Sequence, residues 1–166
     1  MTLVSRVQID PLQVYVARKG AGTGTQTNST PSIWTAISFA TQTANTYLNL
    51  GPNGFGVQYS GPAAKAFNCS YSLYADKVGN GQRNLEVGLF LGSVTAANLI
   101  LDSRSLRYQR NSNYGETTAE RSGIILTLNP GDIILVGAHH TSGNGNGNRW
   151  ECPPNEGSTL TLAPLE

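Results

Sequence analysis

Apolar and polar residues alternate along several short stretches of this chain. Between residues 67 and 75 apolar side chains occupy every second position, and the same period recurs from 85 to 91. Such alternation is typical of a β-strand with one buried face and one solvated face. Asn80-Gly81 lies between the two stretches and readily takes the positive φ angles of a tight turn. The pattern therefore predicts a β-hairpin over residues 67–91.

Two apolar runs, 124–128 and 133–136, flank the sequence Asn129-Pro130-Gly131-Asp132. These four residues favour a turn, because proline presets φ and glycine accepts positive φ. Asp132 is expected to hydrogen-bond the backbone of that turn rather than to act as an acid or base. Runs that are apolar at successive positions are expected of strands covered on both faces. Further strands are predicted at 32–39, 47–50, 104–110 and 158–163, with at most a helical turn at 63–66 or 94–101.

About eight short strands separated by turn signals predict an all-β fold, a jelly-roll β-sandwich. Residues 1–30 differ from the rest, because an extended apolar segment is followed by a Gly/Thr-rich tract at 20–27. That tract has the composition of a flexible linker. We therefore expect residues 1–30 to form an extended N-terminal arm and linker, with the first 18 residues outside the core. Residues 31–166 are expected to form the jelly-roll domain.

Composition excludes several classes of protein. The chain has 166 residues, of which only 13% are charged, and a net charge of +1. No bulk field therefore recruits nucleic acid or anionic lipid. The best apolar stretch, 123–138, is interrupted by Asn-Pro-Gly-Asp and is too short to span a membrane. The N-terminus has no apolar signal-peptide region. We therefore expect a reducing cytoplasm, which favours free thiols at Cys69 and Cys152 and leaves a disulfide as the alternative.

Groups that could carry chemistry are sparse. No carboxylate pair has a spacing that suggests glycoside cleavage. Adjacent side chains on a strand point to opposite faces, so His139 and His140 are not expected to hold one metal ion. A strand-end histidine facing solvent or a neighbouring subunit is the favoured interpretation. The glycine-rich tract 143–147 is not followed by a helix N-terminus, which argues against a phosphate cradle. We expect no enzymatic activity, no metal and no cofactor.

The run Leu126-Thr127-Leu128-Asn129-Pro130-Gly131-Asp132-Ile133 resembles the L-x-L-x-x-G-D-x-V segment of the tumour-necrosis-factor/complement-type jelly roll. The order of the strands at 67–75 and 87–92 and the closing Ser-Thr-Leu-Thr-Leu run resemble the same family, over residues 32–165. Ala63-Ala64-Lys65-Ala66 departs from the family's Gly-aromatic entry to a strand. Without a signal or stalk, this small jelly roll with one arm resembles the trimeric head-decoration (cement) proteins of tailed bacteriophages and the jelly-roll tips of their fibres.

The resemblance implies a virion structural protein, a homotrimer that is made in the host cytoplasm, binds the outer capsid surface and stabilises it. Its partner is then the major capsid protein, with no nucleic acid or membrane bound. The apolar side chains of the arm would need a partner surface. The candidate capsid-binding arm residues are Val4, Val7, Ile9, Leu12, Val14 and Val16. Low surface charge favours a trimer interface, and its candidate aromatic residues are Trp34, Tyr71, Phe90 and Tyr108.

The alternative is a receptor-binding module of a phage fibre or spike that recognises a host glycan. Its ligand would bind a loop near residues 143–149, where an aromatic face and hydrogen-bond donors come together. The candidate residues for this loop are Asn144, Asn146, Arg149 and Trp150.

Overall fold

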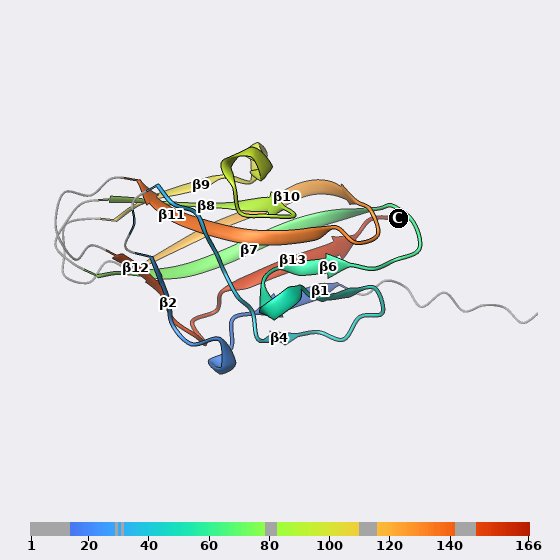
Figure 1. Cartoon of the computed structure of the whole chain (residues 1–166), viewed down its shortest axis with the longest axis horizontal. Coiled ribbons are helices and arrows are strands. Elements are labelled where there is room, and N and C mark those ends of the chain that lie inside the picture. Colours follow the sequence, from blue (N-terminus) through green and yellow to red (C-terminus); the bar gives the residue numbers. More distant parts are fainter. Residues whose placement is uncertain (1–13, 29, 31, 79–82, 110–115, 142–148) are drawn as a thin grey trace, which may run out of the picture.

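The computed structural model describes residues 14–28, 30, 32–78, 83–109, 116–141 and 149–166 of the chain. In this part of the chain two antiparallel sheets pack face to face as a jelly-roll β-sandwich, as expected (Figure 1). One sheet has seven strands and the other has six.

The seven-stranded sheet is built around the long strand β7. One edge of β7 pairs with β10, while β13 and β12 pair with successive parts of its other edge. β1 and β4 extend the sheet beyond β13, and β2 extends it beyond β12. The strands of this sheet are β1 (Tyr15–Arg18), β2 (Gln26–Asn28), β4 (Thr41–Gln42), β7 (Lys65–Val78), β10 (Thr117–Leu128), β12 (Arg149–Cys152) and β13 (Thr159–Pro164).

The six-stranded sheet has the order β5-β6-β11-β8-β9, and β3 pairs with β11. Four short 3₁₀ helices connect strands of the sandwich: η1 (Ala21–Thr23), η2 (Pro52–Gly54), η3 (Ala96–Asn98) and η4 (Leu101–Ser103). η3 confirms the helical turn expected within 94–101, and η4 begins where that range ends. The strands of this sheet are β3 (Thr35–Ala36), β5 (Leu48–Leu50), β6 (Val57–Tyr59), β8 (Arg83–Leu91), β9 (Ser105–Gln109) and β11 (Ile133–Thr141).

The predicted β-hairpin over residues 67–91 is wrong, although both of its strands exist. β7 lies in the seven-stranded sheet, whereas β8 pairs with β11 and β9 in the six-stranded sheet. Alternation of apolar and polar residues shows that one face of each strand is buried. It does not show which strands are paired, because two strands in opposite sheets of a sandwich have the same alternation as two neighbours in one sheet. β10 and β11 are divided between the sheets in the same way, and Asp132 Oδ2 accepts a hydrogen bond from the Asn129 N–H (2.7 Å) in the turn between them.

The N-terminal boundary also differs from the expectation. Residues 14–28 were expected to belong to the arm and linker, yet β1 pairs with β13 and β4, and β2 pairs with β12. Tyr15 and Ala17 are fully buried between the sheets. The glycines at 20, 22 and 24 therefore lie in a surface connection between two strands of the sandwich rather than in a linker outside it. The sequence did not reveal β1 and β2, because strands of three or four residues carry too little pattern to be recognised.

The core lies between the two sheets and is formed by every second residue of each strand. In β7 the odd-numbered side chains from Phe67 to Lys77 are buried, while the even-numbered ones from Asn68 to Val78 are half-buried on the outer face. In β8 the alternate residues Leu85, Val87 and Leu89 enter the core. Positions between them, such as Glu86, project from the outer face of the six-stranded sheet.

Candidate interaction surfaces

The four aromatic residues expected at a trimer interface have different surroundings. Tyr108 is 55% exposed on β9 and Trp34 is half-buried. Tyr71 is buried in the core, where its hydroxyl donates to the Ser103 carbonyl oxygen (2.7 Å) and lies 3.0 Å from that of Val87. Phe90 is also fully buried within the protomer. Tyr71 and Phe90 therefore offer no surface to a partner, which corrects that expectation for these two side chains.

A charged cluster lies on the outer face of the six-stranded sheet and consists of Glu86, Arg104 and His139. Oε1 of Glu86 accepts a hydrogen bond from Nε of Arg104, and Oε2 lies 3.0 Å from Nε2 of His139. The side chain of Glu86 is 7% exposed and that of Arg104 is 52% exposed. A buried carboxylate requires such partners, because its desolvation is costly. The cluster therefore fixes the Arg104 side chain at the surface.

Trp34 packs over the same face and covers the histidine. Its ring centroid lies 4.1 Å from that of His139 and 4.8 Å from that of Phe90, the latter in an edge-to-face arrangement. Gly88 and Gly137, which are paired across β8 and β11, leave room on this face for the ring of Phe90 and for its neighbour Leu99. A Cβ at Gly137 would lie 2.6 Å from Cε2 of Phe90, and one at Gly88 would lie 2.6 Å from Cδ1 of Leu99.

Sequence reasoning did not find the charged cluster. The signal was Glu86 itself, an acidic residue in a strand that is otherwise apolar at the neighbouring positions. Its partners are remote in sequence, and no local spacing connects them. His139 and His140 do point to opposite faces, as the β11 register with Glu86 and Leu85 requires. Neither faces solvent, however: both are buried, with 7% and 1% of their surface exposed, which corrects the expectation of an exposed strand-end histidine.

Among the described residues, two neighbouring rows on the outer face of the seven-stranded sheet are uncharged, and the next row carries Arg18 and Glu120. Cross-strand pairs place Ile125 beside Asn68, Asn68 beside Ala163, and Thr161 between Ser70 and Val16. Val14 precedes the Tyr15–Leu162 pair and so lies next to Ala163. Val14 is 51% exposed and Ile125 is 57% exposed. We call this surface the sheet face; its residues are Val14, Val16, Asn68, Ser70, Ile125, Thr161 and Ala163.

Most of the predicted arm and distal-loop residues lie outside the described residues: Val4, Val7, Ile9, Leu12, Asn144 and Asn146. Val16 is half-buried within β1, and Val14 is exposed just before it. The backbone of Arg149 begins β12. Trp150 is fully buried opposite Lys77, so its ring offers no stacking face for a sugar. This corrects the expectation for Trp150.

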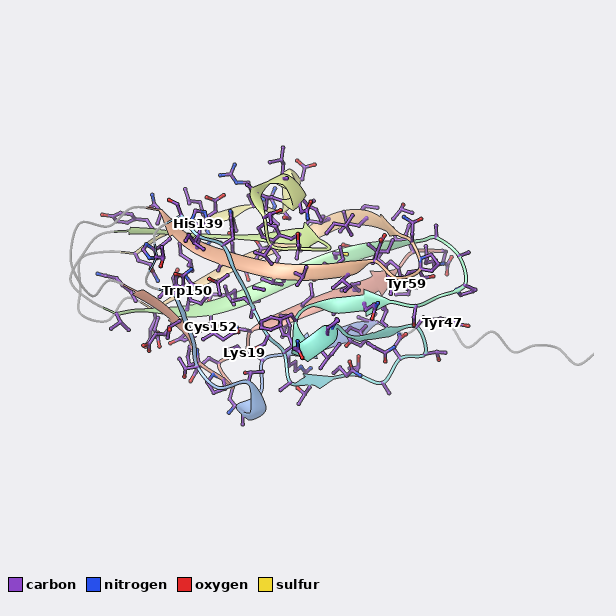
Figure 2. The ribbon with its side chains drawn as sticks, viewed as in Figure 1. Lys19, Tyr47, Tyr59, His139, Trp150 and Cys152 are labelled. Carbon is purple, nitrogen blue, oxygen red and sulfur yellow. The ribbon has the colours of Figure 1, made fainter. Side chains whose placement is uncertain are left out.

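A second polar group is buried in the sandwich and contains Lys19 and Cys152 (Figure 2). Its third member is Ser158, which is 1% exposed. Nζ of Lys19 donates to Oγ1 of Thr23 and to Oε1 of Gln26, at 3.0 Å each. Burial lowers the pKa of Lys19, an effect that the neighbouring Cys152 opposes. Burial raises the pKa of the Cys152 thiol, although the hydroxyl of Ser158, 3.6 Å away, and Lys19 both work against the increase. The backbone N–H of Lys19 donates to the Ser158 carbonyl oxygen and that of Asn155 donates to the Lys19 carbonyl oxygen, at 3.0 Å each, which holds the end of β1 against the chain that follows β12.

Both cysteines are free thiols, and the register of the strands explains why they do not pair. Cys69 lies opposite Leu162 on β7, whereas Cys152 follows the Glu151–Asp76 pair. About six residues of β7 separate these positions, which corresponds to roughly 20 Å along the strand. Burial raises the pKa of Cys69 to about 12.

Among the residues that the structure describes, no group of three or more His, Cys, Asp or Glu side chains could hold a metal ion. None of the helices in the same part of the chain is long and apolar enough to cross a membrane.

Comparison with known proteins supports the fold. The chain is similar to a solved structure described as Eiger TNF from S. frugiperda, with a TM-score of 0.58 and 14% sequence identity. The superposition covers 95% of this chain and 94% of the other. No protein-family model and no curated protein matches the sequence. At this identity the likeness establishes a TNF-like jelly-roll sandwich and nothing about function.

Proposed function

We propose that this chain is a virion structural protein, a homotrimeric decoration protein that binds the outer surface of a capsid and stabilises it without catalysing a reaction. The observation that carries the proposal is the sheet face, an uncharged and partly apolar surface that no other part of the described chain covers. A covering partner would remove Val14 and Ile125 from water. Each fully buried aliphatic side chain of this size contributes about 1.5–3 kcal/mol.

A second copy of the chain is the partner that fits the sheet face best. Its side chains are small or β-branched and carry no charge, so two or three copies could approach without burying an unpaired ion. In this proposal the trimer interface is formed by the sheet face rather than by the aromatic residues Tyr71 and Phe90. Tyr108 and Trp34, on the other sheet, are then left outside the interface.

The residues before Val14 supply the capsid contact in this proposal. They include Val4, Val7, Ile9 and Leu12, and the described chain starts beside the sheet face. In a trimer the three N-terminal segments would therefore start close to one another. Three linked contacts bind a repetitive surface far more tightly than one, because the second and third are intramolecular.

The test uses purified trimer and capsids that lack decoration. We expect the full chain to co-sediment with the particles and to raise the temperature at which they release DNA. A chain lacking residues 1–12 should stay folded and fail to co-sediment. Equal binding by the shortened chain would contradict the role of the N-terminal segment. Unchanged DNA release by fully decorated particles would contradict the stabilising role.

A further inference from the structure

We propose that the outer face of the six-stranded sheet is a binding site for a neutral pyranose sugar, formed by Trp34, Arg104 and Tyr108. This inference goes beyond the proposed capsid role and does not depend on it. The site is on the opposite sheet from the sheet face, so a trimer assembled through the sheet face leaves it open.

The strand register brings these residues to one surface. His139 pairs with Glu86, and Glu86 pairs with Leu106, so the three side chains form a row across β11, β8 and β9. Trp34 packs on the His139 end of the row, while Arg104 reaches Glu86 from the other side. Tyr108, two residues beyond Leu106 on β9, projects from the same face. Three neighbouring strands span about 10 Å, and the four residue steps from Arg104 to Tyr108 span roughly 13 Å along the direction of β9, so the surface has the scale of two or three sugar rings and a single ring covers part of it.

Each of the three residues offers a group that a sugar uses. Tyr108 is 55% exposed, so its ring has surface available for the C–H face of a pyranose. Trp34, which is half-buried with its ring against His139 and Phe90, is the second aromatic residue on this face. The Nε of Arg104 is held by Glu86, which orients the guanidinium. Its terminal nitrogens have no partner within the described ranges, and the side chain is 52% exposed. They form a fixed pair of donors for neighbouring hydroxyl groups.

Charge decides between a neutral and an acidic ligand. The carboxylate of Glu86 balances the guanidinium of Arg104, and the side chain of Glu86 is only 7% exposed. A carboxylate, sulfate or phosphate on the ligand would approach a cluster with no net positive charge and would lie near the buried carboxylate. A hydroxyl-rich neutral ring instead accepts hydrogen bonds from Arg104 without charge repulsion. The cluster therefore favours neutral hexoses over sugar acids.

The experiment follows the two tryptophan indole N–H signals by NMR in the full-length ¹⁵N-labelled protein. The probes are the methyl pyranosides of glucose, galactose, mannose and N-acetylglucosamine, with methyl glucuronide as the acidic comparison. We expect at least one neutral pyranoside to shift the Trp34 signal saturably, with a dissociation constant in the millimolar range typical of single-ring ligands. The buried Trp150 signal should stay in place and serves as an internal control.

Two variants test whether the named residues form the site. Arg104→Gln and Tyr108→Ala should each weaken binding by roughly tenfold, since each removes a charged donor or a stacking face. Arg18→Gln, which removes an exposed arginine from the other sheet, should bind as the unaltered chain does. Tyr108 is so exposed that its truncation leaves the fold intact, so weaker sugar binding by this variant cannot be attributed to unfolding. The inference fails if no neutral pyranoside moves the Trp34 signal, if the glucuronide binds more tightly, or if both variants bind normally. The oligomeric state is measured in a separate experiment, so a failure of the sugar-binding inference can be told apart from a failure of the proposed trimer.

Discussion

At the scale of single residues, two glycines determine how side chains pack on the outer face of the six-stranded sheet. The side chains of Phe90, Val94 and Leu99 occupy the space that the missing side chains of Gly88 and Gly137 leave free. Neither glycine has a positive φ angle, so their role is to leave room for neighbouring groups rather than to permit an unusual backbone.

Replacing Gly137 with alanine tests this role of space. The new Cβ would lie 2.6 Å from Cε2 of Phe90 and 2.7 Å from Cγ1 of Val94, so the Phe90 ring and the Val94 side chain must move. We expect a loss of about 1–3 kcal/mol in the free energy of unfolding, measured by urea denaturation. Gly22→Ala is the matched control, because its Cβ would meet only Cβ of Ala40 at 3.6 Å. Equal denaturation midpoints for the two variants would contradict the packing described.

The buried thiols predict an alkaline limit to stability. Burial raises the pKa of Cys69 from an ordinary value of 9.0 to about 12. Because the folded-state pKa is the higher one, stability is complete below the unfolded pKa and falls as the pH rises toward 12. We expect a loss on the order of a few kcal/mol over that range. Denaturation curves from pH 8 upward should show it.

A Cys69→Ala variant separates this contribution from that of the tyrosines, whose pKa values are also raised by burial at Tyr15 and Tyr71. The variant should start from lower stability but lose less of it between about pH 8 and pH 9.5, where most unfolded tyrosines are still protonated while unfolded thiols ionise. Parallel curves for the two proteins would rule out Cys69 as the source.

At the scale of elements, the sequence was most informative where strands are long. The alternation in β7 and β8 and the apolar run of β11 were enough to predict strands, because many residues share one face. β1, β2, β6 and β12 have only three or four residues each, and their existence depends on partners far along the chain. The sequence predicted which strands form better than it predicted which strands pair, as the division of β7 and β8 between two sheets shows.

The same limit affected the candidate sites. The sheet face combines β1, β7, β10 and β13, and the charged cluster combines β8, β11 and the residue after η4. Neither set is visible until the strands are placed side by side. Trp150 was recognised as an aromatic residue beside a loop, but only the pairing of β12 with β7 shows that it is buried.

Truncation of the N-terminus tests the position of β1. Removing residues 1–12 leaves β1 complete, so we expect an unchanged melting temperature by circular dichroism. Removing residues 1–20 deletes Tyr15 and Ala17 from the core, together with the pairing to β13 and β4. The loss should be at least about 3 kcal/mol, comparable to removal of a large core side chain. A fully stable product of the longer deletion would show that β1 is dispensable.

At the scale of the whole molecule, the sandwich has two outer faces of different character. The outer face of the six-stranded sheet is covered in part, by Trp34 and the segment around η3 and η4, and leaves Arg104 and Tyr108 exposed. The sheet face of the other sheet is uncovered within the described part of the chain. We therefore propose self-association through one face and a ligand on the other. The fold places these surfaces back to back across a core about 10 Å thick.

The central claim is that copies of the chain associate through the sheet face. The most direct measurement is multi-angle light scattering of the full chain beside an Ile125→Glu variant, both at micromolar concentration. The account predicts a particle of three times the 17.6 kDa chain mass for the unaltered protein. It predicts a folded monomer for the variant, because Ile125 is 57% exposed in the protomer and three buried carboxylates would meet in the trimer. A stable 17.6 kDa monomer of the unaltered chain, or a variant that stays trimeric, would contradict the account.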